Sequence, residues 1–351
     1  MDDPETEPES VASQEKPHRR GLKVLRGAIL GFLLVVVLTG GGIAGLYYWA
    51  LQVHHAPGPL GQETTVVVEP GTGVQAIAER LSDAGVIERP EIFVVMLRVT
   101  GQHTRLKAGE YAFPPGISQA GAAAMLVNND IVSRRITIPE GLTVVEIFAI
   151  IEATDGLTGD LPAERPPEGT LLPETYNFTR GDTRVDIVQR MSDAMDATLV
   201  SLWAERAEGL PIDTPEQAVV LASIVEKETG LAGERPHVAS VFINRLNRGM
   251  RLQSDPTVVY ALTEGLGPLG RALTRRDWEV DHPYNTYQIS GLPPGPIANP
   301  GADAIRAVLQ PLETDDLYFV ADGTGGHAFA RTLDEHNRNV ARWRRIRDSG
   351  E

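Results

Sequence analysis

The strongest hydrophobic pattern in the chain is one uninterrupted apolar run near the amino terminus. Residues 27–51 carry no charged side chain and are rich in Leu, Val, Ile and Phe. This run exceeds the roughly 20 apolar residues that are needed to span a bilayer. Tyr47, Tyr48 and Trp49 lie at its far end and are typical of a membrane interface. We predict one transmembrane helix over residues 27–51.

The basic residues around this run predict its orientation. Five precede it, namely Lys16, Arg19, Arg20, Lys23 and Arg26. No Lys or Arg follows the run until Arg80. Positive charge favours the cytoplasmic side, so we expect a cytoplasmic tail over residues 1–26 and an exported remainder. A cleaved signal peptide is the alternative, although the apolar core of such a peptide is typically only about 7–15 residues long.

A strand-then-helix pattern occurs twice after a linker at residues 52–63. Residues 65–68 predict a strand, Gly71 a turn, and Val74 begins a helical spacing of apolar residues. Residues 136–138, Gly141 and Val144 repeat this order. We therefore predict two βα-type units within residues 64–160. Neither holds a cluster of catalytic residue types, so we expect them to present a surface; a chance match of a common pattern is the alternative.

The rest of the chain has a mostly helical pattern. Apolar spacing predicts helices at residues 92–99, from Asp182 or Thr183 onward, and at residues 236–247. Extended segments are predicted at residues 106–114 and as a hairpin at residues 317–329. The Pro-rich stretch 160–167 predicts a boundary before a domain at residues 165–345. Helices with small sheets are typical of the α+β class.

Residues 214–230 (TPEQAVVLASIVEKETG) predict one buried helix that carries a carboxylate at its end. Thr214 and Gln217 have the spacing of a capping box, and Gly230 is a typical helix stop. Glu226 lies on a stripe of apolar side chains, in surroundings that raise the pKa of a carboxyl group. Glu226 is therefore the candidate proton donor, and an ordinary solvated glutamate is the alternative.

Polar and aromatic residues farther along the chain predict a groove. They are Gln253, Asp255, Thr257, Tyr284, Asn285 and Tyr287, and Glu228 is a further groove candidate. The first three alternate along the chain, so an extended segment would place them on one side; a turn is the alternative. The last three precede a Pro- and Gly-rich loop at residues 291–301. Such a rigid wall suits a polymer ligand, whereas a loop packed over the core is the alternative.

Composition excludes several classes of function. The net charge of −15 argues against a nucleic-acid surface. The chain has no cysteine, which excludes disulfides, thiolate metal sites and cysteine nucleophiles. Its eight histidines show no metal-binding spacing, and there is neither a phosphate-binding loop nor a G-x-S-x-G motif. We predict no metal and no cofactor.

Six ordered motifs resemble those of the YceG-like (MltG) endolytic murein transglycosylases. They are LASIVEKETG (221–230), VASVFINRL (238–246), MRLQSDPTVVY (250–260), YNTY (284–287), GLPPGPIANPGADAI (291–305) and LYFVADGTGGHAF (317–329). The match runs in order over roughly residues 168–340. The apolar anchor agrees with it, as does a LysM-like interpretation of residues 64–160.

The resemblance implies a lyase that cuts nascent peptidoglycan strands between N-acetylmuramic acid and N-acetylglucosamine and leaves 1,6-anhydromuramyl ends. The glutamate of the SIVEKE motif, assigned to Glu226, is the implied catalyst. It would act as acid and then as base, without consuming water. The expected glycan-groove residues are Gln253, Asp255, Tyr284, Asn285 and Tyr287, with Glu174 of the LLPETYNF segment as a further candidate.

The resemblance also implies a location and partners. We expect a single-pass protein of the inner membrane with periplasmic carboxy-terminal domains, acting in cell wall assembly and glycan length control. Its expected partners are glycan strands and peptidoglycan synthases, with no nucleic acid. The alternatives are a catalytically silent peptidoglycan-binding scaffold and a hydrolytic muramidase, which would consume water.

Overall fold

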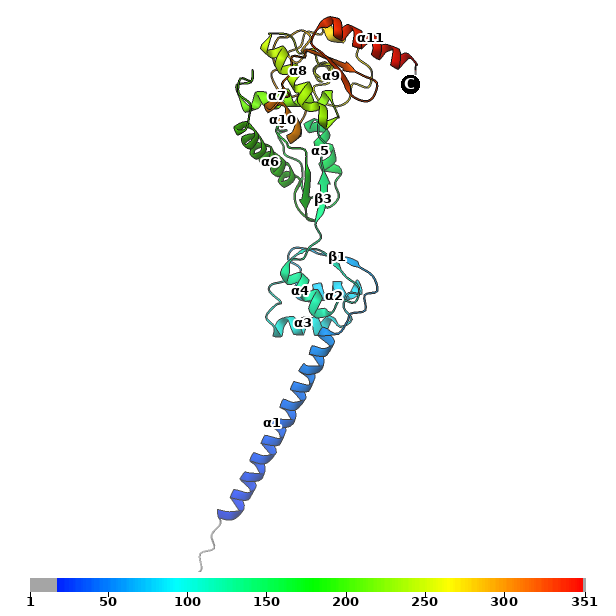
Figure 1. Ribbon diagram of the computed structural model, residues 1–351. Coiled ribbons are helices and arrows are strands. Elements are labelled where there is room, and N and C mark those ends of the chain that lie inside the picture. The colour runs from blue at the N-terminus through cyan, green and yellow to red at the C-terminus, as the bar shows by residue number, and fades with distance from the viewer. Residues whose placement is uncertain (1–17, 350–351) are drawn as a thin grey trace, which may run out of the picture. The chain divides into compact units, whose positions relative to one another are not determined.

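The computed structural model describes residues 18–349, and its contacts divide the chain into two units between Ile131 and Val132. The amino-terminal unit begins with one long helix, α1 (His18–His55), drawn in blue in Figure 1. Residues Val24–His55 are long and apolar enough to cross a membrane. The predicted span, 27–51, lies inside this helix. Of the predicted tail, residues 1–17 lie outside the described residues, and residues 18–26 belong to α1.

The rest of the amino-terminal unit is a small β–α–α–β arrangement followed by a helix. Its elements are β1 (Thr64–Val68), α2 (Val74–Asp83), α3 (Pro90–Val99), β2 (Gly109–Phe113) and α4 (Gln119–Asn128). Strands β1 and β2 pair antiparallel. Gly71 has a φ of 80°, the left-handed conformation that favours glycine at the predicted turn. Phe93, Tyr111 and Phe113 are fully buried and form its core with the helices.

The second βα unit opens the carboxy-terminal part. It comprises β3 (Arg134–Thr137), α5 (Val144–Ala153) and β4 (Thr175–Phe178), and its strands pair antiparallel. Gly141 has a φ of 75°, which matches the turn at Gly71. Helix α6 (Arg184–Ala204) then begins at a capping box made by Thr183 and Asp186. Contacts join this second unit to the residues that follow it, whereas the sequence grouped residues 64–160 together. The LysM-like nature of the two units stays a prediction.

The remaining elements surround one central helix. They are α7 (Pro215–Glu228), η1 (Ala232–Glu234), α8 (Arg235–Asn247), α9 (Asp255–Thr263), η2 (Asp277–Glu279), α10 (Ala302–Leu309), β5 (Tyr318–Ala321), β6 (His327–Ala330) and α11 (Leu333–Ser349). Every residue of α7 from Ala218 to Val225 is buried, and the helix packs against α8, α9 and α10. The predicted hairpin is confirmed as β5 and β6.

Both ends of α7 differ in detail from the sequence prediction. Thr214 Oγ1 accepts from the Gln217 amide at 3.3 Å, but the Gln217 side chain accepts from the amide of Asp213 rather than of Thr214. The helix ends without a glycine cap, because Thr229 is extended (φ −138°, ψ 129°) and Gly230 lies beyond it. The chain therefore leaves the helix directly after Glu228.

Candidate active site

The last turn of α7 carries two glutamates that face different surroundings. Glu226 and Glu228 are two positions apart, and each helical residue turns by about 100°, so their side chains lie on nearly opposite sides of the helix. The neighbours on each side decide what each carboxyl group can do.

Glu226 is enclosed in an ion pair. Its side chain is 4% exposed, its Oε1 accepts from Arg235 Nη2 at 2.8 Å, and its Oε2 accepts from the Gly301 amide at 3.0 Å. Burial raises the pKa of Glu226, while the Gly301 amide and the Arg235 guanidinium oppose this shift. Burial opposes the charge of Arg235, but the carboxylates of Glu226 and Glu140 outweigh it and raise the pKa of Arg235. Both oxygens of Glu226 thus have charged or backbone donors.

The turn of the second βα unit contributes to this ion pair. Glu140 Oε2 accepts from the same Arg235 Nη2 at 2.7 Å. Beside it, the Gly141 carbonyl accepts from Lys227 Nζ at 3.0 Å, and the Gly141 amide donates to the Asn299 carbonyl at 2.9 Å. The turn of this unit is therefore attached to the end of α7, and the surface role expected for the unit stays a prediction.

Glu228 lies beside a cavity. The cavity has a volume of about 430 Å³, and its lining includes Glu228, His327, Trp343 and Arg347. Glu228 Oε1 accepts from Ser254 Oγ at 2.5 Å. Burial raises the pKa of Glu228 to about 7, and the Ser254 hydroxyl opposes this shift. A carboxyl group of this kind holds its proton near neutral pH beside space for a ligand.

A carboxylate–histidine pair lines the same cavity. His327 Nδ1 lies 2.8 Å from Glu234 Oε2, and the His327 amide donates to Glu234 Oε1 at 2.9 Å. Burial works against the charge of Glu234, but its bonds to His327 outweigh burial and lower the pKa of Glu234. Thr229 Oγ1 also donates to Glu234 Oε2 at 3.3 Å. The imidazole is thus held by one of its two ring nitrogens.

The predicted alternation of residues 253, 255 and 257 is wrong. Helix α9 begins at Asp255, and Pro256 lies in its first turn, so the segment is not a strand. Gln253 is exposed with a φ of 51°, whereas Thr257 is fully buried. The residue that points at the glutamate is Ser254, which the alternation placed on the opposite side.

Asp255 and Tyr287, two of the predicted groove residues, are in contact. Tyr287 OH donates to Asp255 Oδ1 at 2.8 Å, and Trp278 Nε1 donates to the same oxygen at 3.0 Å. The two rings stack with centroids 5.4 Å apart. The charge of Asp255 contributes to the raised pKa of Glu228, so this group belongs to the surroundings of the cavity glutamate.

Other predicted groove residues have different neighbours. Asn285 is fully buried and donates to the carbonyls of Trp278 and Val280, so it holds a loop. Tyr284 packs on Tyr260 with ring centroids 4.8 Å apart. Glu174 is exposed immediately before β4. A ligand role for Gln253, Tyr284, Asn285 and Glu174 stays a prediction.

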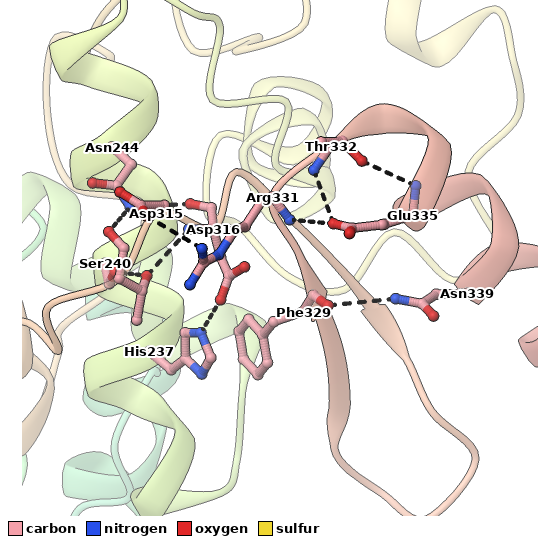
Figure 2. A network of polar contacts seen from close by, with 11 residues as sticks. His237, Ser240, Asn244, Asp315, Asp316, Phe329, Arg331, Thr332, Glu335 and Asn339 are labelled. Atoms are coloured by element: carbon pink, nitrogen blue, oxygen red, sulfur yellow. Dashed lines mark hydrogen bonds and ion pairs between the residues drawn. The ribbon is translucent and has the colours of Figure 1, made fainter.

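A second acid–histidine pair lies on α8. Figure 2 shows His237, Ser240 and Asn244 of this helix pointing toward the segment around Asp316. His237 Nε2 lies 2.8 Å from Asp316 Oδ2. The His237 ring stacks on the Phe329 ring, with centroids 3.4 Å apart. This pair resembles that of Glu234 and His327 in chemistry, but it fastens α8 to the segment before β5.

Sequence reasoning missed Ser254, Trp278 and His327, and it chose Glu226 over Glu228. One signal for Ser254 was available, because a Ser followed by Asp and Pro is a common helix start. His327 lies within the motif at residues 317–329. No local pattern distinguishes the two glutamates, because their surroundings come from distant segments.

Comparison with known proteins gives one consistent result. The model of the YceG-like family matches residues 66–342. A Bacillus subtilis (strain 168) protein named endolytic murein transglycosylase is 32% identical over 299 residues, covering 76% of this chain and 81% of that protein. A Streptococcus pneumoniae (strain R6) protein of the same name is 30% identical over 365 residues, covering 90% of this chain.

The chain spans 65% of the length of that Streptococcus pneumoniae relative. A crystal structure of a putative yceG-like protein from Listeria monocytogenes is 31% identical, with a TM-score of 0.48. That match covers 79% of this chain and 99% of the other.

Proposed function

The chain belongs to the YceG-like family, and we propose that it is an endolytic murein transglycosylase. Its substrate is the glycan strand of peptidoglycan, and the bond cleaved joins N-acetylmuramic acid to N-acetylglucosamine. The products carry 1,6-anhydromuramyl ends, and the role is in cell wall assembly and glycan length control. The names of the relatives and the chemistry of the cavity both support this proposal.

The observation that carries the proposal is the carboxyl group of Glu228 at a cavity of about 430 Å³. A proton donor needs a pKa near neutral and access to the leaving oxygen. Glu228 combines a pKa of about 7 with a place in the lining of this cavity. We therefore assign the acid to Glu228, while the assignment to Glu226 stays an untested prediction that its ion pair with Arg235 disfavours.

The reaction needs few groups. Because Ser254 donates to Oε1 of Glu228, Oε2 is the oxygen that carries the acidic proton. That proton passes to the glycosidic oxygen, and the bond from this oxygen to the muramyl C1 breaks. The C6 hydroxyl closes on C1 to form the anhydro ring, and no water is consumed. In the simplest version the Glu228 carboxylate takes up the C6 proton.

The proposed location is argued from the apolar helix near the amino terminus. Helix α1 is compatible with a single-pass membrane anchor. We propose the inner membrane, with the amino terminus in the cytoplasm and the carboxy-terminal residues in the periplasm, where they reach new glycan strands. Peptidoglycan synthases, which make these strands, are the proposed protein partners.

Digestion of polymeric murein by the full-length protein in detergent tests the function. Mass analysis is expected to show products with new anhydromuramyl ends, which arise from cuts within long strands. Products heavier by one water would identify a hydrolytic muramidase instead. Unchanged glycan in the presence of folded protein would support the scaffold alternative and end the enzymatic proposal.

A further inference from the structure

We propose that His327, oriented by Glu234, is a second catalytic residue, whose Nε2 accepts the proton of the muramyl C6 hydroxyl. The inference rests on the proposed function and divides its two proton transfers between two side chains. Glu228 remains the acid that protonates the leaving oxygen.

The geometry that points to His327 is its position and its tether. His327 lines the same cavity as Glu228. Its Nδ1 faces Glu234 Oε2 at 2.8 Å, and its side chain is 15% exposed. A carboxylate accepts but does not donate, so Nδ1 carries the hydrogen and Nε2 is the basic nitrogen. A carboxylate in this position also stabilises the imidazolium that forms when Nε2 takes a proton.

The backbone makes this orientation rigid. Glu234 Oε1 also accepts from the amide of His327 at 2.9 Å. The same carboxylate therefore contacts both the backbone amide and the ring nitrogen of His327. The ring lies edge-on to Phe319, with centroids 5.2 Å apart. Together the two bonds fix both the backbone and the ring of His327.

The proton balance closes without another reactant. The proton of Glu228 goes to the glycosidic oxygen, and the bond from that oxygen to C1 breaks. The C6 oxygen then bonds to C1, and the C6 proton goes to Nε2 of His327. Glu228 is now a carboxylate and His327 an imidazolium. Transfer of one proton from His327 to Glu228 across the cavity restores both groups.

The charged and titratable groups around this pair come from several elements. Those that act on Glu228 are Asp255, His327 and Arg245, and Glu228 in turn acts on Tyr287. Glu234 faces His327, and Arg347 of α11 lines the cavity. Activity requires a neutral His327 and a protonated Glu228. In general a base sets the acidic limb of a pH profile and an acid sets the alkaline limb.

The pH profile of kcat for His327→Gln, measured with the full-length protein on murein, tests the proposal. We expect a fall in kcat of about 100-fold or more at the optimum, which is typical for loss of a general base, and loss of the acidic limb. An acidic limb that persists with kcat within about threefold of wild type would overturn the inference. If Glu228→Gln is inactive in the same assay, the proposed function survives that result.

His237→Gln is the matched control, because His237 is also paired with a carboxylate but fastens α8 to a neighbouring segment (Figure 2). Its acidic limb should remain. If His327→Gln fails to fold, Glu234→Gln answers the same question, since its amide oxygen still accepts from His327 while the negative charge is lost. The imidazolium is then less stable, so the acidic limb should move to lower pH. An unmoved limb would refute the role of His327.

Discussion

The last turn of α7 carries a glutamate on each of two sides, and the two carboxyl groups have different surroundings. Glu226 is closed in by Arg235 and the Gly301 amide, with 4% of its side chain exposed. Glu228 accepts one hydrogen bond, from the Ser254 hydroxyl, and faces a cavity. Burial raises the pKa of both, but only one of them has a full cationic partner in contact.

The difference shows that a raised pKa alone does not identify a catalytic acid. A proton donor also needs an oxygen that is not engaged by a cation, and space for the substrate. Arg235 and the Gly301 amide engage the two oxygens of Glu226, and Arg235 connects three segments: α7, α8 and the turn before α5. One side of the helix end joins three segments, and the other side carries the acid that we propose.

The largest expected difference between the two glutamates is in the catalytic activity of their glutamine variants. We expect Glu228→Gln to lower kcat by about 1,000-fold or more, because the amide cannot donate a proton to the leaving oxygen. Glu226→Gln should keep most of the activity of its folded fraction. Release of anhydromuramyl products measures both variants. The opposite ranking would return the acid to Glu226.

Stability should separate the same two variants in the other direction. Glu226→Gln removes a buried charged hydrogen bond to Arg235, so we expect a loss of about 2 kcal/mol in the free energy of unfolding. Urea denaturation of the full-length protein in detergent measures this loss. A Glu226→Gln protein as stable as wild type would show that the ion pair does not hold the helix end.

The pH dependence of stability gives Glu228 its own signature. Its folded pKa of about 7 lies above the usual value, so its contribution is fully present at low pH and is lost as pH rises through about 7. Glutamine resembles the neutral acid. Glu228→Gln should therefore match wild type near pH 4 and be more stable near pH 8. Melting temperatures at the two pH values check the sign, and a variant less stable at pH 8 contradicts it.

Ser254→Ala tests how the Ser254 hydroxyl affects the carboxyl group of Glu228. The Ser254 hydroxyl stabilises the Glu228 carboxylate, so its removal raises the pKa of Glu228 and moves the alkaline limb of activity to higher pH. A net hydrogen bond is worth about 1 kcal/mol, which limits the shift to less than about one pH unit. The pH profile of kcat measures it, and Ser240→Ala on α8 is a control that should leave the limb in place.

The smallest effect is expected at Glu140. Its side chain is 39% exposed, so its bond to Arg235 is weakened by solvent, and Glu140→Gln should cost less than about 1 kcal/mol. The double variant with Glu226→Gln tests whether the two carboxylates share Arg235. A loss larger than the sum of the single losses would show that each compensates for the other.

Much of the fold could be predicted from local patterns. The first strand and the turn of each βα unit, the start of α6 at Thr183 and the closing hairpin follow from apolar spacing, glycine and capping residues, whereas β4 was not predicted. These features depend on neighbours within a few positions. Where a local rule was applied with the wrong period, at residues 253–257, the prediction failed, because a helix starts there.

The sequence by itself determined that α7 is buried and that it ends in a pair of glutamates. Only the tertiary structure decided which glutamate faces the cavity. Glu226 meets Gly301 and Glu228 meets Ser254, contacts that span 75 and 26 positions of the chain. Periodicity reports which side of a helix is apolar, but the sign of the charge and the free space on each side come from segments that folding brings there.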